Sequence, residues 1–123
     1  MSNSYIREML IDMYGESCWL KGAVSKKNPL TLHHIVPVRF GGKTTIDNGA
    51  LLTVERHQLF NLLENIEPML ADEVNYYLHE YHGLYPQIVD ERVDTLIQQM
   101  YITKEQFDLE HTQKVKKKKY KCR

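Results

Sequence analysis

A long loop between two short apolar segments constrains the fold of this chain most. Residues 30–35 and 51–54 are each rich in leucine and β-branched residues and predict two short strands. Between them stand Pro37 and two glycines at positions 41 and 42. Proline lacks a backbone N–H and adjacent glycines favour turns, so regular structure cannot continue through this stretch. The centre of the chain is therefore predicted as strand, loop to about residue 48, and strand.

Helical periodicity surrounds this centre. Apolar residues recur at helical spacing over 4–14, and Gly15 is a suitable stop. A helix over about 55–65 follows the second strand and ends before Pro68. Three further helices are predicted over about 70–82, 89–100 and 103–113, the last opened by a capping box of Thr103 and Gln106. We therefore expect an α+β fold that is mostly helical, with one N-terminal helix and about three C-terminal helices.

Composition excludes several classes of protein. The 123 residues fit one domain, and 42% hydrophobic with 26% charged residues predicts a folded core. No apolar run approaches the roughly 20 residues that span a bilayer, and the start at Met1 lacks a signal-peptide core. The two cysteines, Cys18 and Cys122, are too far apart in sequence to indicate a disulfide scaffold. These features predict a cytoplasmic protein without membrane contact.

The net charge of zero conceals a segregation of charge. Residues 1–60 carry a net charge of +2, residues 61–113 carry −9, and residues 114–123 carry +7. A terminal basic block commonly contacts nucleic acid or another polyanion. Alternatively, the basic tail is solvated and folds back on the acidic surface of its own chain. A contact with a polyanion and a tail folded back on its own chain both stay open as interpretations.

Three groups of polar residues are candidates for a metal or catalytic site: the pair His33 and His34, Asn48 after the loop, and His57 with Asn61. The last two are four residues apart on a predicted helix, so they share one face and can reach a single ion. With His33 at the strand end, two imidazoles and one amide oxygen could hold a divalent cation with open positions for water and phosphate. His34 would remain a free imidazole that can take a proton from water.

Neighbouring side chains in a strand point to opposite faces, so His33 and His34 would not reach one site from a regular strand. For both to serve one site, the substrate must lie across the strand end, or the strand must twist there. Pro37 just beyond favours irregular backbone at this point.

This combination resembles the HNH endonuclease motif, particularly the His-His form found in nuclease colicins. The resemblance covers about residues 18–61 and rests on Leu32-His33-His34-Ile35-Val36-Pro37, Gly41-Gly42, Asp47-Asn48, Leu51-Leu52-Thr53 and Arg56-His57 with Asn61. It implies a ββα-metal core and a metal-dependent phosphodiesterase that cuts DNA, leaving a 5′-phosphate and a 3′-hydroxyl.

The resemblance also implies a role for each residue of the set. His34 looks like the general base that activates water, and His33 and His57 look like the first and second metal ligands. Asn61 stands where the family has a final His or Asn ligand. Asn48 looks like the central asparagine that holds the loop and helps to orient the base. The expected cofactor is one divalent ion, Mg²⁺ or Mn²⁺ first, with Ni²⁺ or Zn²⁺ as alternatives.

The chain departs from the family pattern at the structural zinc. Many HNH proteins hold this zinc with two Cys-x-x-Cys pairs, but here only Cys18 remains, and Thr53 and Arg56 stand where the second pair would be. No structural zinc is expected. A two-stranded fold with one helix buries too little surface to be stable alone. The flanking helices must complete the core, whose expected members include Met9, Leu10, Trp19, Leu20, Leu51, Leu59 and Phe60.

We expect one domain over 1–113, with an HNH core at about 18–65 and a helical extension over 66–113, followed by a flexible basic tail over 114–123. The candidate DNA contacts are basic residues beside the site and in the tail: Arg39, Lys43, Lys116, Lys117, Lys118 and Lys119. One hypothesis is a DNA endonuclease of a bacterium or phage, with homodimerisation left open. The other is a binding module or an inhibitor of a nucleic-acid enzyme, which would engage a protein through the acidic residues 61–113.

Overall fold

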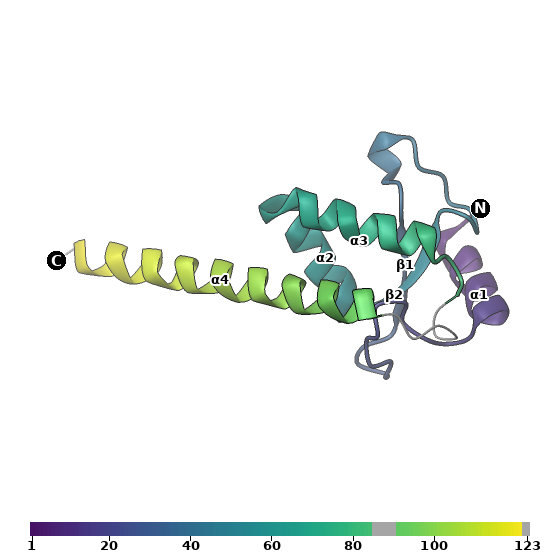
Figure 1. The fold of residues 1–123 in the computed structure, drawn as a ribbon, viewed down its shortest axis with the longest axis horizontal. Helices are drawn as coiled ribbons and strands as arrows, with labels where there is room; N and C mark the ends of the chain where they lie inside the picture. The colour runs from purple at the N-terminus through teal and green to yellow at the C-terminus, as the bar shows by residue number, and fades with distance from the viewer. Residues whose placement is uncertain (85–90, 122–123) are drawn as a thin grey trace.

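The computed structural model describes residues 1–84 and 91–121, with side chains over 1–84 and 91–112. Within these residues the fold is α+β and mostly helical, as the sequence predicted (Figure 1). The elements in chain order are α1 (Asn3–Tyr14), β1 (Leu30–His34), the 3-10 helix η1 (Val38–Phe40), β2 (Gly49–Thr53), α2 (Val54–Ile66), α3 (Pro68–Glu80) and α4 (Glu91–Lys121). None of the described helices combines the length and apolar character that crossing a bilayer requires.

The centre of the fold is a two-stranded antiparallel sheet followed directly by a helix. β1 and β2 pair in a register that places His33 opposite Ala50 and His34 opposite Gly49. Thr53 ends β2 and caps α2, because its hydroxyl accepts a hydrogen bond from the backbone N–H of Arg56. α1 covers one side of the sheet and α2 the other (Figure 1). The sheet therefore lies between two helices, with His33 on the side of α2.

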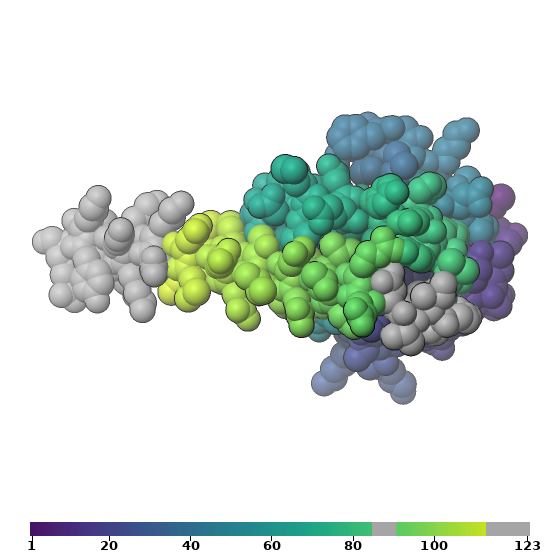
Figure 2. All heavy atoms as spheres, viewed as in Figure 1, coloured from purple at the N-terminus to yellow at the C-terminus, as the bar shows by residue number. Residues whose placement is uncertain are grey.

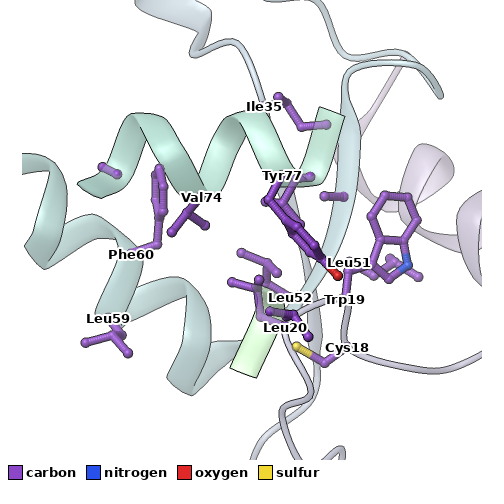
Figure 3. Close-up of a cluster of buried hydrophobic side chains, with 14 of the residues drawn as sticks. Cys18, Trp19, Leu20, Ile35, Leu51, Leu52, Leu59, Phe60, Val74 and Tyr77 are labelled. Carbon is purple, nitrogen blue, oxygen red and sulfur yellow. The ribbon is translucent and has the colours of Figure 1, made fainter. Parts of the chain in front are cut away.

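The core lies between the sheet and the helices packed around it, and Figure 3 shows the part of it beside α2 and α3. Six of the seven core residues expected from the sequence are buried: Leu10, Trp19, Leu20, Leu51, Leu59 and Phe60. Met9 is only half-buried, because Ile6 and Leu10 form the inner face of α1. On α3 the buried face is Leu70, Ala71, Val74, Tyr77 and Leu78, so this helix adds apolar surface that the small ββα core lacks.

Hydrogen bonds occupy the place where the family pattern would put a structural zinc. The buried Cys18 Sγ accepts from the backbone N–H of Thr53 at 3.3 Å. The Arg56 guanidinium donates to the Leu20 carbonyl at 2.9 Å and to the hydroxyl of Tyr101 on α4. Arg56 and Tyr101 thus tie α4 to the start of α2, and Cys18 and Leu20 tie the segment before β1 to the same place.

The C-terminal half contains two helices among the described residues, where about three were expected. α4 runs without interruption through Thr103, so the capping-box pattern does not start a new helix. The physical reason is that no glycine or proline stands between Met100 and Thr103, and a single threonine costs a helix only about 0.7 kcal/mol or less. The helix also continues to Lys121, past the predicted end at 113, and projects beyond the other elements (Figure 1). The predicted start at residue 89 and the side chains of the basic tail lie outside the described residues.

Candidate active site

The loop between β1 and β2 protrudes from the body and forms one edge of the candidate site (Figures 1 and 2). Gly42 is required for its turn, because a Cβ there would lie 1.7 Å from the Val36 carbonyl oxygen. Asn48 holds the loop closed. Its Oδ1 accepts from Val36 N–H at 2.8 Å, and its Nδ2 donates to the carbonyls of Val36 and Lys43 at 3.0 and 2.9 Å. Asn48 therefore fixes the loop, while the role that the resemblance implies for it at the site stays a prediction.

One cavity of about 170 Å³ collects most of the predicted site residues. His33, His34, His57 and Asn61 all line it. The remaining lining residues are Pro37, Val38, Phe60 and Glu64. Both histidines of the pair reach the same cavity because His34 is the last residue of β1, so the site lies across the strand end. This is one of the two arrangements by which neighbouring strand residues could serve a common site.

His33 is the most buried polar side chain of the cavity, with 4% of its surface exposed. Its ring lies edge-on to Phe60 at 4.5 Å and to His57 at 5.3 Å between ring centres. Burial lowers the pKa of His33 from 6.5 to about 4, so the imidazole is neutral at pH 7. Its Nε2 lies 2.7 Å from Oδ1 of Asn75. Since an amide oxygen only accepts, Nε2 carries the proton, and Nδ1 keeps the lone pair.

His57 is held in the opposite tautomer. Its Nδ1 lies 2.8 Å from the Thr31 hydroxyl, and that hydroxyl donates its only proton to the Leu52 carbonyl at 2.7 Å. Thr31 must therefore accept from His57, which places the ring proton on Nδ1 and the lone pair on Nε2. Burial lowers the pKa of His57 as well, which favours the neutral ring.

His34 is half-buried, and its Nε2 lies 3.0 Å from the hydroxyl of Thr44 in the loop. The side-chain amide of Asn48 is bonded to the loop backbone. Asn48 also fixes the backbone directly after His34, because its carbonyl accepts from the Ile35 N–H at 2.9 Å and its side chain bonds Val36. Thr44 is a residue that the sequence did not single out, because its contact depends on the path of the loop.

Two polar side chains of α2, Asn61 and Glu64, line the cavity, and Arg39 lies next to Glu64. Asn61 is solvent-exposed and lies one helical turn after His57 on α2. Glu64 follows one turn later and forms an ion pair with Arg39 at 2.9 Å. Arg39 and Lys43, two candidate DNA contacts, are both exposed beside the site. The sequence could have revealed Glu64, because it stands seven residues after His57 and so shares its helix face.

The donor chemistry of the cavity fits a divalent cation. Two neutral imidazoles each keep one lone pair while the other ring nitrogen donates to a fixed oxygen, which is the usual state of histidine ligands. Asn61 and Glu64 add oxygen donors, which suit Mg²⁺ and Mn²⁺. Over residues 1–84 and 91–112, however, no three His, Cys, Asp or Glu side chains already converge as a metal site. The donors line the cavity wall, and the set depends on Asn61 for its third ligand.

A larger cavity of about 740 Å³ lies between α3 and α4, away from the histidines. Four carboxylates line it, from Asp72, Glu73, Glu80 and Glu91. A negative wall of this kind repels a phosphodiester. The smaller histidine cavity therefore remains the candidate for chemistry on nucleic acid.

Two antiparallel strands followed by a helix form a ββα unit, and histidines from β1 and α2 line one cavity of it. The comparison with protein families agrees, since residues 16–57 match the family described as HNH endonuclease. This segment is thus similar to HNH endonucleases, as the resemblance implied. The match ends at His57, so Asn61, Glu64 and Asn75 lie outside it. Searches of curated proteins and solved structures gave no match, and no comparison supports the binding-module alternative.

Proposed function

We propose that this chain is a metal-dependent endonuclease that hydrolyses phosphodiester bonds in DNA. The observation that carries the proposal is the single cavity in which His33, His34, His57 and Asn61 meet within and beside an HNH domain. A bacterial or phage-infected cytoplasm, where DNA is accessible, forms part of the same proposal.

The residues divide into a proton acceptor and a set of ligands. His34 takes the proton from the attacking water on Nδ1. The Thr44 hydroxyl holds the ring at the other nitrogen, Nε2. His33 and His57 offer Nδ1 and Nε2 respectively, and Asn61 offers its amide oxygen. A divalent ion bound there, Mg²⁺ or Mn²⁺ first and Ni²⁺ or Zn²⁺ as alternatives, stabilises the negative charge that develops on the phosphate and the leaving oxygen.

DNA reaches the cavity from the side of the protruding loop in this proposal. Arg39 and Lys43 stand exposed at that edge and supply phosphate contacts. The acidic helices α3 and α4 disfavour an approach from their side. Lys116, Lys117, Lys118 and Lys119 are proposed as a further phosphate anchor, which rests on the sequence alone because their side chains lie outside the described residues.

The decisive experiment follows the nicking of supercoiled plasmid. The full chain is incubated with EDTA, Mg²⁺, Mn²⁺, Ni²⁺ or Zn²⁺, beside His34→Ala and the control His79→Ala. His79 is an exposed histidine on α3, so its removal tests for nonspecific effects of losing an imidazole. Loss of a general base predicts a fall of about 100-fold or more in rate for His34→Ala and none for the control. Absence of nicking with every metal, or equal nicking by His34→Ala, refutes the proposal.

A separate measurement tests the ligand set. Mn²⁺ is titrated into the wild type and into His57→Ala by calorimetry, without DNA. Removal of one of three protein ligands predicts a clear loss of affinity. Equal affinities would remove His57 from the set.

A further inference from the structure

The helix that follows the HNH domain contributes a side chain to the candidate site. Asn75 lies in the middle of α3, 18 residues beyond the end of the family match. It is half-buried, and its Oδ1 lies 2.7 Å from Nε2 of His33. α3 packs on α2, the helix that carries His57 and Asn61, and from this neighbouring helix Asn75 contacts His33 directly. Figure 3 shows α3 beside the labelled Phe60, whose ring packs against His33.

The contact selects one state of the His33 ring. A neutral imidazole has one N–H and one lone pair, and it can exchange them by changing tautomer or by rotating. The Asn75 oxygen can only accept, so the hydrogen bond exists only when Nε2 is protonated. The lone pair is then restricted to Nδ1. Phe60 and His57 lie edge-on against the ring and restrict its rotation.

We propose that Asn75 is a positioning residue that holds His33 in the Nε2–H tautomer, so that Nδ1 is ready to bind the divalent ion. The inference rests on the proposed function for the identity of the ligand, but the tautomer itself can be measured without it. Asn75 acts on His33 in the same manner as Thr31 acts on His57, although with the opposite ring nitrogen. Outer partners of this kind typically change metal affinity by about 10- to 100-fold.

The direct test is the protonation pattern of the His33 ring, read from nitrogen chemical shifts by NMR. The metal-free full chain is compared with Asn75→Ala, Asn75→Asp and the control Asn65→Ala. Aspartate still accepts from Nε2, whereas alanine does not. Asn65 lies on α2, and its side chain makes an exposed hydrogen bond to the Asn61 carbonyl. We expect the proton on Nε2 in the wild type, the Asp variant and the control, and loss of that preference in Asn75→Ala.

Two results overturn the inference: a wild-type proton on Nδ1 of His33, or an unchanged tautomer in Asn75→Ala. Should the alanine variant fail to fold, Asn75→Ser, whose hydroxyl is too short to reach Nε2, takes its place under the same criteria.

The second readout is the affinity for Mn²⁺ by calorimetry. Asn75→Ala should lose about 10- to 100-fold in affinity, whereas Asn75→Asp and Asn65→Ala should stay near the wild type. A changed tautomer with unchanged Mn²⁺ affinity refutes the positioning role. If the tautomer and affinity results hold while the wild type never nicks plasmid, the proposed function fails and the role of Asn75 stands.

Discussion

Burial of the His33 imidazole couples the stability of this fold to pH. The folded pKa is about 4, whereas an unfolded histidine titrates near 6.5. Between these two values the unfolded chain binds more protons than the folded one, so acid favours unfolding. The stabilisation is complete above pH 6.5 and is lost as the pH falls towards 4. The separation of about 2.5 pKa units corresponds to about 3.4 kcal/mol of unfolding free energy in total.

Most of this loss of unfolding free energy falls in a pH range in which unfolding is easily measured. Linkage with these two pKa values gives a loss of about 2 kcal/mol between pH 7 and pH 5 from His33 alone. The lowered pKa of His57 acts in the same direction. The wild type should therefore lose more than this amount, and His33→Gln, which has no titrating ring, should lose about 2 kcal/mol less over the same range.

Urea unfolding in EDTA measures these free energies, with the fluorescence of the single buried Trp19 as the signal. The slope against pH is the relevant quantity, because His33→Gln also changes packing and therefore shifts the free energy at every pH. His79→Gln is the matched control, since its histidine is exposed. Equal slopes for the wild type and His33→Gln would show that His33 is not held neutral by burial, and the reasoning would fail.

Three further changes test the scaffold by urea unfolding. Gly42→Ala should lower the free energy of unfolding by about 1–3 kcal/mol, because its Cβ would collide with the Val36 carbonyl. A loss below about 0.5 kcal/mol would mean that the loop adapts freely. Asn48→Ala should cost about 1–3 kcal/mol and speed amide exchange at Val36, since it leaves loop backbone groups unpaired; unchanged exchange would contradict this. Tyr101→Phe should cost about 0.5–1.5 kcal/mol, because Arg56 loses its acceptor on α4, and a neutral result would exclude that tie.

The sequence predicted the ββα centre and its histidines because their signals are local. The short leucine-rich segments, the glycine turn and the four-residue offset on α2 each depend on near neighbours in the chain. The structure accordingly brings His33, His34, His57 and Asn61 to one cavity. The roles of these residues stay predictions until the nicking and titration experiments are done.

Features that depend on packing between distant segments could not be predicted. Asn75 has no motif around it, and its contact with His33 exists only because α3 packs on α2. The continuity of α4 through Thr103 was also hidden, because a capping pattern has the same letters inside a helix as at its start. Met9 satisfies the helical period but lies at the side of the buried face, which is narrower than the pattern suggested.

The helices after the HNH domain do more than complete a small core. An HNH fold without its zinc needs another connection at the start of α2, and Arg56 with Tyr101 of α4 provides one. The same C-terminal half reaches the histidine cavity through Asn75 of α3. One consequence follows for any shortened form of this chain. Removing α3 and α4 would expose the core and also release the His33 ring, so loss of metal binding in such a fragment would not identify a ligand. Point variants at Asn75 and Tyr101 separate the two effects, because the first acts on the ring and the second on the scaffold.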